Sequence, residues 1–152
     1  MGCGASNDAQ QAEGIASFFG KVVTIKTCHG NFLRAHAGEA GAVLDQQTEA
    51  HEWEQWTIED AGEGKVFFKS HHGTWIRANA PTDEEATVDM SGAAHEWEQF
   101  EAVAEGDQWR FKSHHGTFLR ANEGGEGATV DQKKDVDTLG DWENFTVAVV
   151  EA

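Results

Sequence analysis

Paired histidines are the residues of this chain whose type and spacing could most readily do chemistry. They recur every 43 residues, with a cysteine in place of the first histidine in the first copy: Cys28-His29, His71-His72 and His114-His115. Imidazole is the side chain that titrates near neutral pH, so His29, His71, His72, His114 and His115 could form a pH sensor or a pH-dependent binding surface. Protonation of all 8 histidines would change the formal net charge from −16 to −8.

Two other roles for these histidines stay open. Cys28, His29 and the two pairs could supply metal ligands if their turns converge. Adjacent residues of a strand point to opposite faces, so at most one member of each pair could reach a shared ion, and we predict no metal site. The alternative is that these are hydrogen-bonded turn histidines, each of which satisfies backbone groups.

Carboxylates and the single Cys-His neighbour pair raise the question of catalysis. A glycosidase needs two carboxylates across the scissile bond, and the chain has 27 Asp and Glu residues. The most regularly placed of them, Asp45, Asp89 and Asp131, are explained as strand-end or turn residues. Cys28 beside His29 has no third residue that would orient the base. We therefore expect no enzyme and no cofactor, and the net charge of −16 argues against nucleic acid.

The N-terminus carries a candidate lipidation signal. Met1 is followed by Gly2, Cys3 and two small residues, with Ser6 at the sixth position, which fits N-myristoylation of Gly2. One myristoyl chain binds membranes only marginally, with a constant of about 10⁴ M⁻¹. Residues 1–19 contain no Lys or Arg, so palmitoylation of Cys3 is the candidate second anchor. The prediction is a flexible acylation segment over 1–19 and a cytoplasmic location at the inner face of a membrane; the alternative is an unmodified start.

The histidines belong to a longer repeated motif. IKTCHGNFLRA begins at Ile25, FKSHHGTWIRA at Phe68 and FKSHHGTFLRA at Phe111, again 43 residues apart. A fixed period of about forty residues indicates copies of one supersecondary unit, none of which can bury its apolar face alone. We divide the chain into repeats 20–62, 63–106 and 107–152.

The pattern of apolar and polar residues predicts four short strands in each repeat. The first and second flank a His-Gly turn, and alternation of apolar and polar residues indicates half-buried strands. The third strands are expected at 42–45, 86–89 and 128–131, and the fourth at 53–56, 97–100 and 142–145. Three four-stranded units around a pseudo-threefold axis make an all-β protein with the β-trefoil fold, and one domain over 20–152. Trp53, Trp97 and Trp142 are expected in the core, and residues 9–19 could form a short helix.

The motif Lys69–Ile76 and its copy Lys112–Leu119 resemble the fascin-like group of β-trefoils. That resemblance, over residues 20–152, implies a non-enzymatic protein that binds actin filaments and, in histidine-rich members, membranes in a pH-dependent way. Actin filaments are acidic, so contact would need local basic patches. Six repeated basic residues could provide them: Lys26, Arg34, Lys69, Arg77, Lys112 and Arg120. The alternative is that these side chains pair with neighbouring carboxylates.

Two functions therefore follow from the sequence. The first is a monomeric, lipid-anchored actin-filament-binding trefoil that links membrane and cytoskeleton. The second is a trefoil binding module for carbohydrate or a protein partner, because the fold alone does not settle function. Trefoil lectins carry an aromatic platform and an Asp in each repeat, and Asp45, Asp89 and Asp131 with Trp75 could be mistaken for such a set.

Overall fold

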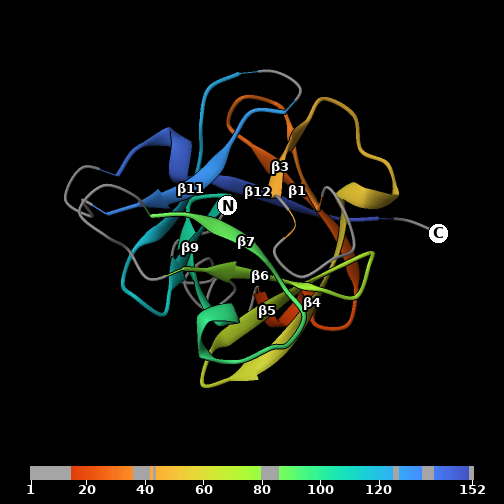
Figure 1. Ribbon diagram of the computed structural model, residues 1–152, viewed down its shortest axis with the longest axis vertical. Coiled ribbons are helices and arrows are strands. Elements are labelled where there is room, and N and C mark those ends of the chain that lie inside the picture. The colour runs from red at the N-terminus through yellow and green to blue at the C-terminus, as the bar shows by residue number, and fades with distance from the viewer. Residues whose placement is uncertain are drawn as a thin grey trace, which may run out of the picture.

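The computed structural model describes residues 15–35, 42, 44–79, 86–124, 127–134 and 139–150, and Figure 1 shows their arrangement. The described chain is built from short strands and single 3-10 turns. The strands are β1 (Val22–Thr27), β2 (Phe32–Ala35), β3 (Leu44–Gln47), β4 (Gln55–Gly62), β5 (Lys65–Ser70), β6 (Trp75–Ala78), β7 (Val88–Ser91), β8 (Phe100–Glu105), β9 (Gln108–Ser113), β10 (Phe118–Ala121), β11 (Val130–Lys133) and β12 (Phe145–Val149). The 3-10 turns are η1 (Ile15–Phe18), η2 (Glu52–Glu54), η3 (Glu96–Glu98) and η5 (Asp141–Glu143).

Six strands close into a barrel. In order around it, β1, β4, β5, β8, β9 and β12 pair antiparallel, and β12 returns to β1. The remaining strands form three hairpins, β2–β3, β6–β7 and β10–β11, which cover one end of the barrel (Figure 1). Three equivalent four-stranded units around one axis confirm the predicted β-trefoil.

The core follows from the period-two pattern of the barrel strands. Val23, Ile25, Val66, Phe68 and Phe111 alternate with exposed or half-buried residues and are fully buried. Their rings and branched side chains meet the aromatic residues of the fourth strands, Trp56, Phe100 and Phe145. The Phe111 ring lies 4.8 Å from that of Phe68 and 5.7 Å from that of Phe145, between centroids. Large rings from all three repeats therefore fill one shared core.

The prediction that Trp53, Trp97 and Trp142 are core residues is wrong. These side chains are 40%, 38% and 39% exposed, and they lie on the 3-10 turns instead of the fourth strands. The cause is the glutamate that follows each of them. The buried carboxylates of Glu54, Glu98 and Glu143 accept hydrogen bonds from the backbone N–H groups of His51, His95 and Gly140 at 2.5–2.6 Å. Because the glutamate turns inward to cap the 3-10 turn, the preceding tryptophan turns outward.

The boundaries of two elements also differ from the sequence-based ranges. The third strands begin two residues later, at Leu44, Val88 and Val130. Ahead of them, the carbonyls of Ala42 and Ala86 accept hydrogen bonds from the third strand of another repeat. At the N-terminus, Ile15 is buried and Phe19 pairs with Ile58, so packed chain is present within the range expected to be flexible. Of the range 9–19, where a short helix was expected, only residues 15–19 are described, and they contain the 3-10 turn η1. Gly2 and Cys3 lie outside the described residues.

Candidate binding sites at the repeat boundaries

The His-Gly turn of each repeat is fixed by a hydroxyl group. In the second repeat the Ser70 Oγ accepts hydrogen bonds from the N–H groups of His72 (3.1 Å) and Thr74 (3.2 Å). Gly73 has φ of +88°, a left-handed conformation that favours glycine, and its N–H donates to the Ser70 carbonyl at 3.1 Å. The other repeats use Ser113 with Gly116 and Thr27 with Gly30 in the same way. The turn therefore holds its two central side chains in fixed directions.

The second histidine of each turn binds the preceding repeat. His72 Nε2 lies 3.2 Å from the carbonyl oxygen of Ala35, and His115 Nε2 lies 2.9 Å from that of Ala78. His29 Nε2 lies 2.9 Å from the Ala121 carbonyl oxygen, which closes the ring from the first repeat to the third. A carbonyl oxygen only accepts, so each Nε2 carries the hydrogen. These three histidines form hydrogen bonds to backbone, as one of the open alternatives predicts.

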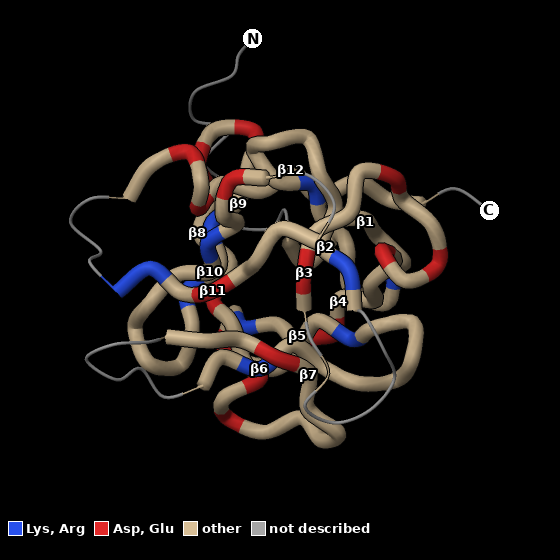
Figure 2. Tube along the Cα trace, turned by 45° about the horizontal axis from the view of Figure 1, so that its top comes forward, with Lys and Arg blue, Asp and Glu red and all other residues tan. Residues whose placement is uncertain are grey.

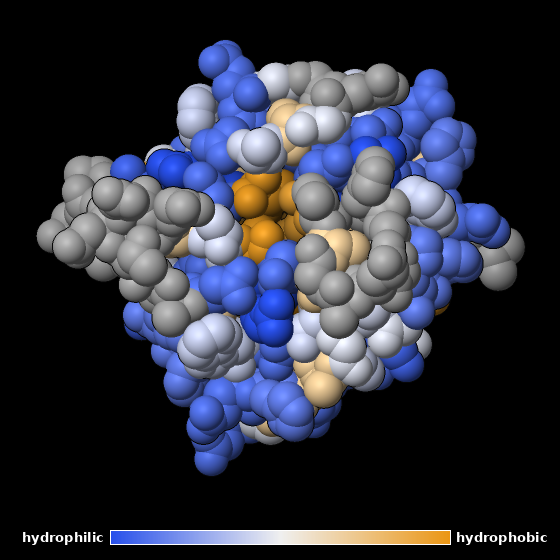
Figure 3. Space-filling view, in the orientation of Figure 1, coloured by the Kyte–Doolittle hydropathy of each residue, from blue (hydrophilic) through white to orange (hydrophobic). Residues whose placement is uncertain are grey.

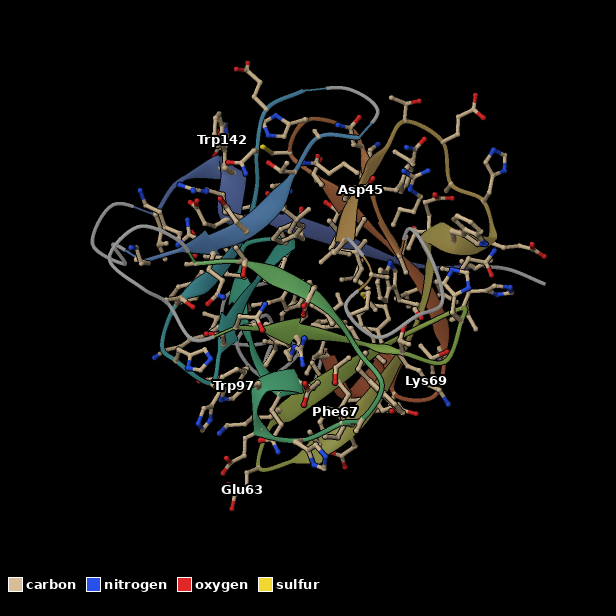
Figure 4. All side chains as sticks on the ribbon, in the orientation of Figure 1. Asp45, Glu63, Phe67, Lys69, Trp97 and Trp142 are labelled. Carbon is tan, nitrogen blue, oxygen red and sulfur yellow. The ribbon has the colours of Figure 1, made fainter. Side chains whose placement is uncertain are left out.

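Each of these imidazoles also supports an exposed tryptophan of the preceding repeat. Trp53 meets His72 edge to face with ring centroids 4.9 Å apart, and Trp97 meets His115 at 5.0 Å. Trp142 meets His29 at 5.3 Å, and all three pairs have an interplanar angle of 71°. Trp97 and Trp142 lie at the periphery, on η3 and η5, in Figure 4. We call these pairs the Trp–His sites.

Polar hollows adjoin the Trp–His sites. Two of them are equivalent grooves on the barrel wall beside the histidine turns, with volumes of about 420 and 330 Å³. We call them the His71 groove and the His114 groove. The first is lined by Gln55, Thr57, Glu59, Lys69, His71 and His72 among others, the second by Lys65, Gln99, Glu101, Lys112, His114 and His115. A further hollow of about 300 Å³ contains Trp97 itself, with Arg77, Ser91, His95, Glu96 and Glu98.

The first residues of the turns take a different position. His71 and His114 are exposed, and their rings lie 5.7 and 5.6 Å from those of the following histidines. The expectation that adjacent histidines face apart is wrong, because both stand in a turn and not within a strand. Among the described residues, no group of three His, Cys, Asp or Glu side chains could hold a metal ion.

The repeated basic residues divide into two groups. Arg34, Arg77 and Arg120 form bidentate pairs at 2.7–2.9 Å with carboxylates directly opposite on the neighbouring strand: Asp45, Asp89 and Asp131. These hydrogen bonds raise the pKa of Arg77 and Arg120 above the ordinary value for arginine. The arginines are thus committed to the carboxylate pairs that the alternative interpretation predicts.

The lysines lie elsewhere. Lys69 and Lys112 line the two grooves, and the Lys69 Nζ stands 5.5 Å from the Trp75 ring centroid. Lys26, at the equivalent position of the first repeat, is exposed with its Nζ 6.0 Å from the Phe32 ring. The structure therefore groups Lys69 with His71 and His72, and Lys112 with His114 and His115.

Cys28 does not form an activated nucleophile. Its Sγ lies 3.6 Å from His29 Nε2, closer than expected for strand neighbours because both residues stand in the turn. Partial burial, followed by the Asp141 and Glu143 carboxylates, raises the pKa of the thiol above its ordinary value of 9.0. The reactive form is the thiolate, so these surroundings disfavour nucleophilic chemistry at Cys28.

Sequence reasoning missed the Trp–His sites because tryptophan is most often buried. One signal could have found them. Each tryptophan stands between two acidic residues. The second acidic residue accepts a hydrogen bond from the backbone N–H three residues before it, as Glu54 does from His51. That spacing is typical of a capping box, which would place the tryptophan on a helical turn and not in a strand.

The surface around these sites is predominantly hydrophilic. Figure 2 shows acidic residues on the turns and on strands such as β3 and β7, with basic residues between them. Figure 3 shows apolar side chains gathered at the centre of the face that carries β3, β7 and β11. No helix in the described part of the chain is both long and apolar enough to span a bilayer.

Comparison with known proteins places the fold among solved β-trefoils. No family model matches the chain, and no curated protein sequence matches it. The designed threefold-symmetric protein ThreeFoil superposes with a TM-score of 0.78 at 20% identity, over 85% of this chain and 99% of that one. The Polyporus squamosus lectin, solved with a human-type influenza-binding epitope, gives 0.70 at 20% identity, over 85% of this chain and 49% of its own. SeviL bound to asialo-GM1 saccharide gives 0.65 at 13% identity, over 84% and 95%. At these identities the likeness shows the fold alone.

Proposed function

We propose that this protein is a non-catalytic carbohydrate-binding module with three Trp–His sites. The observation that carries the proposal is the repetition of an exposed tryptophan, about two-fifths accessible, held edge-on by a histidine of the next repeat. An indole offers a large, rigid apolar face, which suits the C–H face of a sugar ring. The neighbouring polar hollows offer donors and acceptors for hydroxyl groups.

The comparisons support this proposal without deciding it. Two of the similar trefoils were solved with saccharides, and a third neighbour is an exo-β-1,3-galactanase, of which this chain matches 30%. We propose no hydrolysis for this chain, because Asp45, Asp89 and Asp131 are bound bidentately by arginines.

The test is binding of the purified protein to an immobilised panel of galactose-, glucose-, mannose- and N-acetylhexosamine-containing glycans. We expect binding to at least one neutral glycan. Trp53→Ala, Trp97→Ala and Trp142→Ala should each weaken it, and the triple variant should lose it by roughly 100-fold or more, because multivalent avidity is lost with its component sites. Trp109→Phe is the matched control, since Trp109 lies on β9 and lines none of these hollows. Unchanged binding by a folded triple variant would contradict the proposal.

The second candidate function is a lipid-anchored actin-filament-binding trefoil, of which hisactophilin is the example within the fascin-like group. The specific observations that favour it are the Met1-Gly2-Cys3 start and the repeated Lys-Ser-His-His-Gly motif. Co-sedimentation with actin filaments at pH 6 and pH 7.5 tests it directly, with pelleting expected to increase at the lower pH. Membrane release of Gly2→Ala in a eukaryotic host tests the anchor. Pelleting that survives the triple tryptophan variant would assign the actin contact to a different surface.

A further inference from the structure

The histidines of two Trp–His sites, His72 and His115, also line a polar groove. His72 contacts the Trp53 ring on one side and lines the His71 groove on the other. Gln55, two residues after Trp53, lines the same groove. The arrangement recurs one repeat later, where His115 contacts Trp97 and lines the His114 groove together with Gln99. At two repeat boundaries, a tryptophan platform and a polar groove are therefore continuous through one imidazole.

The groove chemistry suits a hydroxyl-rich ligand. In the His71 groove, Gln55 and Thr57 offer amide and hydroxyl groups, and Lys69 adds an ammonium donor. Glu59 accepts a hydrogen bond from Trp75 Nε1 through Oε1 at 3.0 Å, which fixes its carboxylate. The His114 groove has Gln99 and Lys112 at the positions of Gln55 and Lys69, and Glu101 at the position of Thr57. Mixed donors and acceptors with little apolar lining favour a sugar over a hydrophobic ligand.

We infer that these two sites bind an oligosaccharide, with one sugar on the indole and the next in the adjoining groove. This inference rests on the proposed function and specifies its ligand as a chain of at least two sugar units. Grooves of about 420 and 330 Å³ are large enough for more than a single bridging water. His72 and His115 are positioning residues, because each holds the tryptophan at the mouth of its groove.

The third boundary differs in residue content. There Cys28 replaces the exposed histidine, and the groups that correspond to the groove lining bond to each other. Gln108 Nε2 donates to Thr146 Oγ1 at 3.2 Å, and Asn144 Oδ1 accepts from Arg110 Nε at 2.8 Å. Polar groups already paired gain less from a ligand than groups that exchange water for it. The Trp142–His29 site therefore binds a single sugar unit and gains nothing from a longer chain.

The experiment compares chains of increasing length in three homologous series: glucose, N-acetylglucosamine and galactose, each as monosaccharide, disaccharide and trisaccharide. In the series that binds, we expect the disaccharide to bind at least about tenfold more tightly, equivalent to roughly 1.4 kcal/mol, through groove hydrogen bonds. Two groove variants, Gln55→Ala/Lys69→Ala and Gln99→Ala/Lys112→Ala, combined in one protein should remove that gain, so that the ratio of disaccharide to monosaccharide affinity falls to about one. Lys21→Ala, an exposed lysine outside both grooves, is the matched control.

Nitrogen-15 NMR gives a readout independent of affinity. The monosaccharide should shift the indole N–H signals of all three site tryptophans, and the disaccharide should in addition shift the side-chain amides of Gln55 and Gln99 but not that of Gln108. Equal affinity for mono- and disaccharide with silent groove amides would overturn the two-part site and leave the proposed function standing. Absence of binding in all three series, with a glycan panel also negative, would overturn both.

Discussion

A single imidazole nitrogen links each repeat to the one before it. Loss of the His72 side chain would free the Ala35 carbonyl and also remove the ring on which Trp53 rests. The sequence shows that a histidine recurs at this turn, but not that its partner is 37 residues away for His72 and His115, and 92 residues away for His29. Only closure of the barrel brings repeat one against repeat three. The sequence therefore predicts the His-Gly turn but not the distant carbonyl to which its histidine is hydrogen-bonded.

Cys28 offers a test of the local electrostatics at the third boundary. Its thiol pKa is raised, mainly by desolvation and then by Asp141, so the thiolate is disfavoured at neutral pH. We expect alkylation by iodoacetamide to be slow at pH 7.5 despite the exposed position, with a rate midpoint above pH 9.0. Asp141→Asn removes a negative charge and should lower the midpoint and speed alkylation; Glu63→Gln, on a distant turn, should not.

The sign of the linkage follows from the same shift. The folded state binds the Cys28 thiol proton more tightly than the unfolded state does. The thiol therefore stabilises the fold below its unfolded-state pKa, and this contribution is lost as the pH rises through its folded-state pKa. A Cys28 that reacts as fast in the native protein as in urea would show that its surroundings do not disfavour the thiolate.

At the scale of elements, β3, β7 and β11 form a triangle that closes the hairpin end of the barrel. Asp45 pairs with Thr129, and Thr87 pairs with Asp131, each through an isolated bridge between repeats. The middle residue of each strand points to the centre: Gln46, Met90 and Gln132, all nearly or fully buried. Gln132 Nε2 donates to the carbonyls of Asn79 (2.9 Å) and Thr87 (2.6 Å), and Gln46 does the same for Asn122 and Thr129 at 2.9 Å.

Gln132 lets the hydrogen-bond and packing contributions of this triangle be separated. Gln132→Ala removes one hydrogen bond each from two carbonyls and the Thr117 hydroxyl and opens a cavity, so we expect a loss of about 2–4 kcal/mol in the free energy of unfolding. Gln132→Met keeps the volume, as Met90 does in the second repeat, and should cost about half as much. Urea unfolding measures both, and a Met variant as stable as the parent would show that the amide contributes only volume.

The same strands show how far sequence patterns reach. Strand number follows from the alternation around the His-Gly turns, and the described residues contain the four strands predicted for each repeat. The third strands were placed two residues early, because Ala42, Ala86 and Ala128, ahead of these strands, accept single backbone hydrogen bonds from the third strand of another repeat. The fourth strands were extended over Trp53, Trp97 and Trp142, because the glutamate cap that turns them outward is a long-range packing outcome of Glu54, Glu98 and Glu143.

At the scale of the whole molecule, charge opposes the fold. The chain carries a formal charge of −16, and folding brings these charges closer together than the unfolded chain does. Three bidentate Arg–Asp pairs act in the opposite direction, but each is partly exposed and such pairs contribute little individually. Salt weakens both effects, so its net influence on stability reports which is larger.

We expect repulsion to dominate, and therefore stability to rise with ionic strength. Raising NaCl from 10 to 100 mM shortens the screening length from about 30 to about 10 Å, less than the diameter of a domain of this size, so repulsion across the molecule falls most. The gain should be at least about 1 kcal/mol, seen as a rise of roughly 3 °C in the midpoint of thermal unfolding.

Sodium sulfate at matched ionic strength should give the same shift if screening is the cause. Replacing Glu49, Glu52, Glu63 and Glu96 by Gln should reduce the rise of the midpoint with salt, since it makes the net charge less negative and leaves the Arg–Asp pairs in place. A midpoint that falls with added NaCl would mean that the paired arginines, and not the excess of carboxylates, set the electrostatic balance of this trefoil.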